Sequence, residues 1–174
     1  MNFEINNAIE ILEQTPNVVE TLLTRLSSGW IANNEGKDTW SPYDVVGHFI
    51  HGEKTDWIPR MEIILSINQL KKFQAFDRFA QFKDSKGKNL RDLIDEFKTL
   101  RAENIRVLKE KKLSQVDLMK TGIHPDFGSV TLKQLLSAWV VHDLEHIAQM
   151  ARVMSKQYKD EVGPWTKYLP ILNK

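Results

Sequence analysis

The sequence predicts an all-α fold, a four-helix bundle. Apolar residues recur at helical spacing along most of the chain, helix-start signals precede the long apolar stretches, and neither an alternating strand pattern nor an internal repeat is visible. The length of 174 residues predicts a single domain covering residues 1–174. With 41% hydrophobic and 27% charged residues, the chain has enough apolar surface to bury a core, which excludes a disordered protein.

Two prolines interrupt the first half of the chain. Thr15-Pro16 combines an N-cap residue with proline at a first helical position, so we expect the first helix to break there and a second stretch to run to about residue 27. The next helix begins after the capping residue Ser41 and carries apolar residues from Val45 to Leu65. Because Pro59 removes a backbone donor inside this helix, we expect a kink near Thr55–Pro59.

The second half supplies two more helices. Asn89 opens one of them, whose apolar stripe ends at Leu108, and a Thr131-x-x-Gln134 capping box opens the last, which extends through Val153. The aromatic tail at 163–172 is expected to dock on the bundle. Between the second and third helices, phenylalanine recurs at every third position, which favours aromatics that cover the core over the wall of a substrate pocket (Phe73, Phe76, Phe79 and Phe82).

The composition excludes several functional classes. There is no cysteine, so disulfides, cysteine nucleophiles and thiolate metal sites are excluded. The net charge of +1 comes from 24 basic and 23 acidic residues without a basic stripe, which argues against a nucleic-acid partner. The apolar runs fall far short of the roughly 20 residues that cross a bilayer, and the first residues do not resemble a signal peptide. We therefore expect no membrane association and a cytoplasmic location.

The five histidines give the strongest functional signal (His48, His51, His124, His142 and His146). His142 and His146 lie four residues apart, so both imidazoles occupy one helix face. An isolated pair of this kind most often belongs to half-buried histidines that bind neighbouring groups, but this face is apolar and an unpartnered buried pair is costly (Leu135, Trp139 and Met150). A third nitrogen could come from His48 or His51, and the spacing alone leaves both open. His124 lies beside a proline in a turn, where a solvated loop residue is expected.

Two motifs resemble the DinB/YfiT-like family of bacterial four-helix-bundle proteins. They are Trp40-Ser-Pro-Tyr-Asp-Val-Val-Gly-His48 and His142-Asp-Leu-Glu-His146-Ile-Ala-Gln149, and the resemblance extends over nearly the whole chain. It implies a divalent ion, zinc or nickel, held by three imidazoles, and it maps the third ligand onto His48. The implied metal ligands are thus His48, His142 and His146. The resemblance also implies a homodimer in many members.

The implied chemistry depends on a coordination position that three histidines leave open. Relatives in the family include transferases that use low-molecular-weight thiols, so the first hypothesis is a transferase in which the ion activates such a thiol for attack on a small electrophile. The alternatives are a metal-dependent hydrolase that uses bound hydroxide and a non-catalytic, metal-stabilised stress-response module. Nothing in the residues separates these hypotheses.

Three acidic residues are candidates for a catalytic carboxylate. Asp143 follows the first histidine of the late motif, where many zinc proteases carry glutamate, but aspartate is one methylene shorter and is more often solvated or hydrogen-bonded to a ligand. Glu53 and Asp56 lie near the expected kink, where Asp56 and Arg60 are spaced for an ion pair. Gln149 follows His146 by one turn and is expected to hydrogen-bond into the site.

Overall fold

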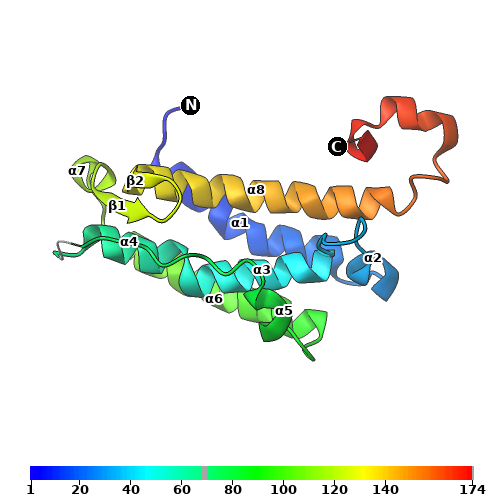
Figure 1. The fold of residues 1–174 in the computed structure, drawn as a ribbon, viewed down its shortest axis with the longest axis horizontal. Helices are drawn as coiled ribbons and strands as arrows, with labels where there is room; N and C mark the ends of the chain where they lie inside the picture. The colour runs from blue at the N-terminus through cyan, green and yellow to red at the C-terminus, as the bar shows by residue number, and fades with distance from the viewer. Residues whose placement is uncertain (68–69, 174) are drawn as a thin grey trace.

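The computed structural model describes residues 1–67 and 70–173. Within these ranges, four long helical rods form the bundle that the sequence predicts: α1 (Ile5–Leu23), α3 (Pro42–Thr55) continued by α4 (Trp57–Leu65), α6 (Leu90–Glu110) and α8 (Leu132–Lys156) (Figure 1). Shorter elements connect and cover them: α2 (Ser28–Ala32), α5 (Ala80–Asp84), α7 (Gln115–Leu118), β1 (Thr121–His124), β2 (Gly128–Thr131), and the 3-10 helices η1 (Gly163–Tyr168) and η2 (Pro170–Asn173).

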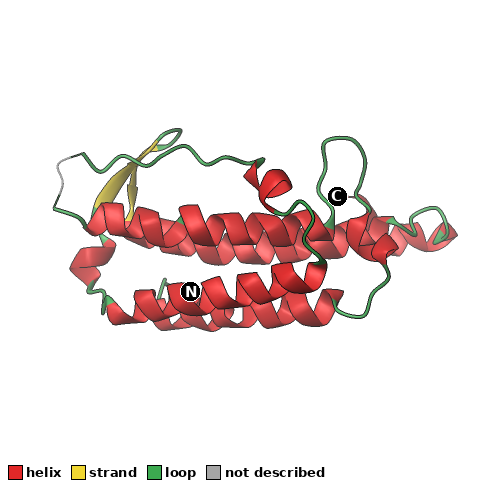
Figure 2. Cartoon of the chain, turned by 90° about the horizontal axis from the view of Figure 1, so that it is seen from below, coloured by secondary structure: helices red, strands yellow, loops and turns green. Residues whose placement is uncertain are grey.

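The rods pack in a closed ring. Helix α1 contacts α6, α6 contacts α3, α3 contacts α8, and α8 returns to α1. Figure 2 shows the long helices lying side by side, with the β1–β2 hairpin beside the bundle near one end. The apolar faces of the rods meet in two clusters of buried side chains, one around Trp139 and Met61 and the other around Phe49 and Phe97. No helix in the described ranges has both the length and the apolarity needed to cross a membrane.

The predicted break at Thr15 is wrong, because α1 continues through Pro16. A proline inside a helix deprives one carbonyl, four residues earlier, of its amide partner. Here that carbonyl belongs to Leu12, and it accepts a hydrogen bond of 2.8 Å from Nη1 of Arg101 in α6. Both Thr15 and Pro16 are buried against the bundle, so tertiary packing and a replacement donor keep the helix intact.

The kink predicted near Thr55–Pro59 is present. Helix α3 ends at Thr55 and α4 begins at Trp57, with Asp56 between them at φ −110° and ψ −71°. The amide of Asp56 still donates to the carbonyl of Gly52 over 2.9 Å, so the two helices form one bent rod. This bend brings Asp56 and Trp57 to the same cleft as the candidate site described below.

The connector before α8 contains a short antiparallel hairpin, which the sequence analysis failed to predict. Thr121 pairs with Thr131 and His124 with Gly128, whose φ of 69° is readily adopted by glycine. Strands of four residues carry too little alternation to be recognised from sequence. Contacts of β1 with α4 and of β2 with α8 fix the hairpin on the bundle.

The aromatic segment and the tail each divide between buried and exposed residues. Phe73 is buried and Phe76 half-buried, and both face the cleft described below, whereas Phe79 and Phe82 are exposed. The tail docks only in part: η2 packs against α8 and buries Leu172, whereas η1 buries no residue and its Trp165 and Tyr168 are exposed.

Candidate metal centre

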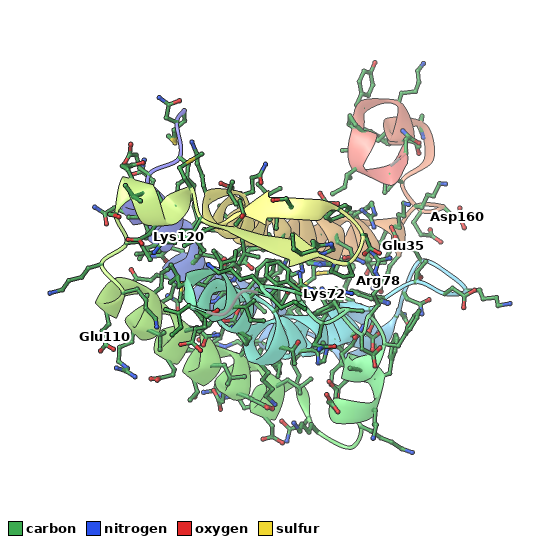
Figure 3. All side chains as sticks on the ribbon, turned by 60° about the vertical axis from the view of Figure 1, so that its left-hand side comes forward. Glu35, Lys72, Arg78, Glu110, Lys120 and Asp160 are labelled. Atoms are coloured by element: carbon green, nitrogen blue, oxygen red, sulfur yellow. The ribbon has the colours of Figure 1, made fainter. Side chains whose placement is uncertain are left out.

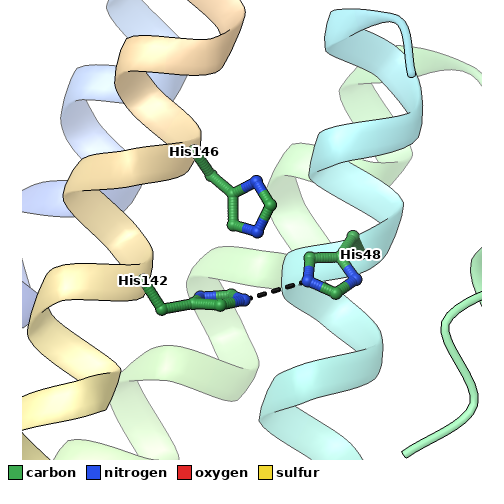
Figure 4. Close-up of side chains that lie close together, drawn as sticks. All are labelled: His48, His142 and His146. Atoms are coloured by element: carbon green, nitrogen blue, oxygen red, sulfur yellow. Dashed lines mark hydrogen bonds between the residues drawn. The ribbon is translucent and has the colours of Figure 1, made fainter. Parts of the chain in front are cut away.

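Three histidines from two helices meet inside the bundle. His48 projects from α3, and His142 and His146 project from α8, so that one ring nitrogen of each lies within 4.8 Å of the others (Figure 4). The Nε2 atoms of His48 and His142 are 2.9 Å apart. His51 lies outside this group, with Nδ1 3.9 Å from Asp84 and its ring against Phe76. The structure therefore places His48 beside the late histidine pair, as the resemblance implies.

Local sequence signals set the two helices that carry these rings. At the start of α3, the Ser41 hydroxyl accepts from the amide of Asp44, and the Asp44 carboxylate accepts from the amide of Ser41. Thr131 and Gln134 form the equivalent reciprocal pair at the start of α8. These capping boxes satisfy amides that have no partner inside a helix and define where each helix begins.

The environment keeps His48 and His146 neutral in the metal-free protein. Burial, followed by the charges of the other histidines, lowers the pKa of His48 to about 2. Burial and His142 lower the pKa of His146 to about 4. Protonation would place positive charge in a poorly solvated pocket, so both rings are uncharged at pH 7. A neutral imidazole has one unprotonated nitrogen, which is the form that binds a metal ion.

These shifts predict that acid destabilises the metal-free protein. In the unfolded chain a histidine has its usual pKa near 6.5 and takes up a proton below that value, while folded His48 and His146 do not until far lower pH. Below pH 6.5, each of these two histidines should lower the free energy of unfolding by about 1.4 kcal/mol per pH unit. Together they should lower it by about 4 kcal/mol between pH 7 and pH 5. Urea unfolding of chelator-treated protein at both pH values measures this loss. Replacing His146 with glutamine should remove nearly half of it, and an equal loss in the variant would contradict the assignment.

The donor set fits a divalent ion. Nδ1 of His146 lies 2.7 Å from Oε1 of Gln149, the contact expected from the sequence, and an amide oxygen can only accept, so Nδ1 carries the proton and Nε2 a free lone pair. Among the described residues, the buried Nδ1 atoms of His48 and His142 have no hydrogen-bond partner. Imidazole nitrogens in a tetrahedral zinc site lie about 3.3 Å apart. The three ring nitrogens here lie within 4.8 Å of one another, and the Nε2 atoms of His48 and His142 are 2.9 Å apart. Small movements of the rings would thus bring all three to one ion.

Two of the candidate carboxylates lie in the core behind the histidines. Glu53 and Asp143 both accept hydrogen bonds from Arg101, at 2.7 and 2.6 Å, and the side chains of the two acids are fully buried. Burial raises the pKa of Glu53 despite the neighbouring Arg101. Burial acts to raise the pKa of Asp143, but its interaction with His142, followed by the charge and the hydrogen bonds of Arg101, outweighs this cost, so the pKa is lowered. Neither carboxylate lines the cleft.

Asp56 is the candidate carboxylate that does line the cleft. It forms the predicted ion pair with Arg60, one turn along α4, and both side chains are almost fully buried. Burial raises the pKa of Asp56, and the charge of Arg60 opposes this shift.

A cleft of about 1010 Å³ opens onto the histidines. Aromatic rings form part of its walls, and the Trp40 ring lies 4.7 Å from that of His48 and 6.0 Å from that of His146, centroid to centroid. His124 also lines it, because Nδ1 accepts from the amides of Asp126 and Phe127 and the ring stacks on Phe127. The expectation of a solvated loop residue is therefore wrong for His124, which is half-buried. His124 belongs to strand β1, so its place in the cleft wall could not be predicted without the β1–β2 hairpin, which the sequence analysis failed to predict.

Comparisons with known proteins agree with this fold. The family model described as the DinB superfamily matches residues 11–150. A solved structure, YfiT from Bacillus subtilis, is similar with a TM-score of 0.73 and 19% identity, covering 87% of this chain and 86% of that one. YfiT is described as a probable metal-dependent hydrolase with an unusual four-helix bundle topology. None of the curated proteins matches the chain.

The matched region contains the kinked α3–α4 rod and the three histidines, and it extends over most of the chain. The four-helix bundle is thus the fold that this chain shares with YfiT, and the three histidines lie within the residues that the family model matches. By its sequence and its fold, the chain belongs to the DinB superfamily.

Proposed function

We propose that this protein is a metal-dependent enzyme whose His48, His142 and His146 hold a divalent ion, zinc or nickel, that activates a nucleophile. The observation that carries this proposal is the convergence of three ring nitrogens at the floor of a cleft large enough for a small-molecule substrate. An ion with an open position lowers the pKa of a bound water or thiol, so that a nucleophile forms near neutral pH.

The pairing of the carboxylates favours a thiol as the nucleophile. Glu53 and Asp143 are engaged by Arg101, and Asp56 is engaged by Arg60. A general base must reach the proton that it removes, and these groups are held by arginines instead. A thiol held by such an ion would be deprotonated outright, whereas a water held there, with a pKa of about 7, would be only partly ionised at neutral pH without a base. We therefore propose transfer of a low-molecular-weight thiol to an electrophile, in which the new S–C bond replaces a carbon–leaving-group bond and the thiol proton passes to solvent.

The cleft walls support an electrophile with an apolar body and an anionic group. Trp40, Trp57 and Phe76 provide apolar contact area. Arg152, which lines the same cleft, is bound by Glu35, whereas Arg78 has no ion pair or hydrogen bond within the described part of the chain. Arg78 and Glu35, which are labelled in Figure 3, both line this cleft, and the charge of Arg78 acts on His48. A carboxylate on the substrate would pair with this guanidinium.

Hydrolysis is the second candidate, and the similarity to YfiT favours it. In that case water replaces the thiol as the nucleophile, and the ester or amide bond of the substrate is cleaved. The same walls and the same three histidines would serve both reactions.

One pair of assays separates these candidates. Metal-free protein and protein loaded with Zn²⁺ or Ni²⁺ are given a chlorodinitrobenzoate with cysteine or glutathione, and separately nitrophenyl acetate without thiol. We expect metal-dependent release of chloride and loss of thiol, at least ~10-fold above the metal-free control. Metal-dependent ester cleavage without thiol would instead support the hydrolase. Full metal loading with no turnover of either probe would contradict the proposed activity and favour a metal-stabilised module.

A further inference from the structure

A fully paired arginine lies in the core beneath the candidate metal centre. Arg101 of α6 is 2% exposed, and all five of its N–H groups have acceptors. Nη1 donates to Oδ2 of Asp143 and to the carbonyl of Leu12, Nη2 to Oδ1 of Asp143 and to Oε1 of Glu53, and Nε to the same Oε1. The Leu12 carbonyl is available because Pro16 has no N–H to bind it. Three helices therefore meet α6 at this one guanidinium.

This arginine fixes the carboxylate of Asp143. The two parallel hydrogen bonds of 2.6 and 3.1 Å set both the position and the plane of the carboxylate. Oδ1 of Asp143 lies 3.8 Å from Nδ1 of His142, the residue before it in α8. Although this distance exceeds a hydrogen bond, the carboxylate places negative charge beside a buried ring nitrogen that lacks a partner among the described residues.

The position of this charge determines which nitrogen of His142 carries the proton. A lone pair on Nδ1 would face a carboxylate oxygen and be repelled, whereas an N–H there is attracted. On the opposite side of the ring, Nε2 lies 2.9 Å from Nε2 of His48, so one of these two atoms donates and the other accepts. With its proton on Nδ1, His142 is the acceptor and His48 the donor.

We propose that Arg101 and Asp143 are positioning residues that keep the proton of His142 on Nδ1 and direct its Nε2 lone pair into the centre. The benefit of this role for metal binding rests on the proposed function. The position of the proton on His142 does not, because it is a property of the metal-free protein. It parallels the contact of Gln149 with His146, where an amide oxygen sets the tautomer of the second ring on α8. A ligand held in its binding tautomer requires no rearrangement before it coordinates.

The test begins with the metal-free chain. Nitrogen NMR of the labelled histidine rings reports which nitrogen of His142 is protonated, and we expect Nδ1. In Asp143→Asn we expect a mixture of both tautomers and an affinity for Co²⁺, measured by titration, about 10–100-fold weaker. Glu53→Gln is the matched control, because it alters the other carboxylate on Arg101, which the structure does not place beside His142. In this variant the proton should stay on Nδ1 of His142, and the affinity for Co²⁺ should change by less than about 3-fold.

Several outcomes would overturn the proposal. A wild-type His142 with its proton on Nε2 contradicts it directly, and that spectrum decides the question even if Asp143→Asn fails to fold. Equal losses of Co²⁺ affinity in Asp143→Asn and Glu53→Gln would point to a general charge effect and contradict positioning. Should the wild type show the Nδ1 proton but bind no Co²⁺, the tautomer assignment stands and the proposed metal function falls.

Discussion

Replacing His142 with alanine is expected to reduce the divalent metal bound to the purified protein from about one ion per chain to almost none. The substitution removes one of three ring nitrogens that meet at the cleft floor. Loss of a group that merely orients a ligand costs about 10–100-fold in metal affinity, so loss of a ligand should cost at least ~100-fold. Elemental analysis after dialysis against a metal-free buffer measures the effect.

His51 provides the matched control for this experiment. It lies on the same helix as His48, three residues along, but its ring faces Phe76 and Asp84 instead of the other histidines. His51→Ala should therefore keep its full complement of metal, while His48→Ala should lose it. Retention by His48→Ala together with loss in His51→Ala would show that the ligand assignment is wrong.

Replacing Arg101 with methionine is expected to lower the free energy of unfolding by about 3–5 kcal/mol. The change leaves the carboxylates of Glu53 and Asp143 in the core without their cation, and it leaves the Leu12 carbonyl without a donor. Truncating one partner of a buried ionic network is costly because the remaining charges are uncompensated. Urea denaturation at neutral pH, with metal removed from wild type and variant alike, gives the difference.

Arg91 in the same helix supplies a comparison at the surface. Its side chain is 62% exposed and pairs with Glu20 and Asp95. Solvent and salt screen such pairs, so Arg91→Met should change stability by less than about 1 kcal/mol. If Arg101→Met and Arg91→Met lowered the free energy of unfolding by similar amounts, the prediction that the buried Arg101 network stabilises the fold would be wrong.

Features encoded by neighbouring residues were predictable from the sequence. The capping boxes at Ser41 and Thr131 and the kink beside Pro59 depend on side chains and amides within one or two turns, and all three are present. The continuity of α1 could not be predicted in this way, because the donor that replaces the missing amide comes from Arg101, far along the chain.

The candidate site likewise combines features that neighbouring residues encode with features that depend on distant parts of the chain. The placement of His142 and His146 on one face follows from helix geometry, whereas the choice of His48 over His51 depends on how α3 is turned toward α8. Arg101 was overlooked, although it carried a signal: it interrupts the apolar stripe of α6 four residues after Phe97 and four before Ile105, where a charge must be paired to be buried.

X-ray absorption spectroscopy of the zinc-loaded protein tests the central claim most directly. The account predicts three imidazole nitrogens at about 2.0–2.1 Å from the ion, with any remaining ligand supplied by solvent or a thiol. A spectrum with fewer than three imidazoles, or with a fourth ligand from the protein closing the coordination sphere, would contradict a catalytic centre built from His48, His142 and His146.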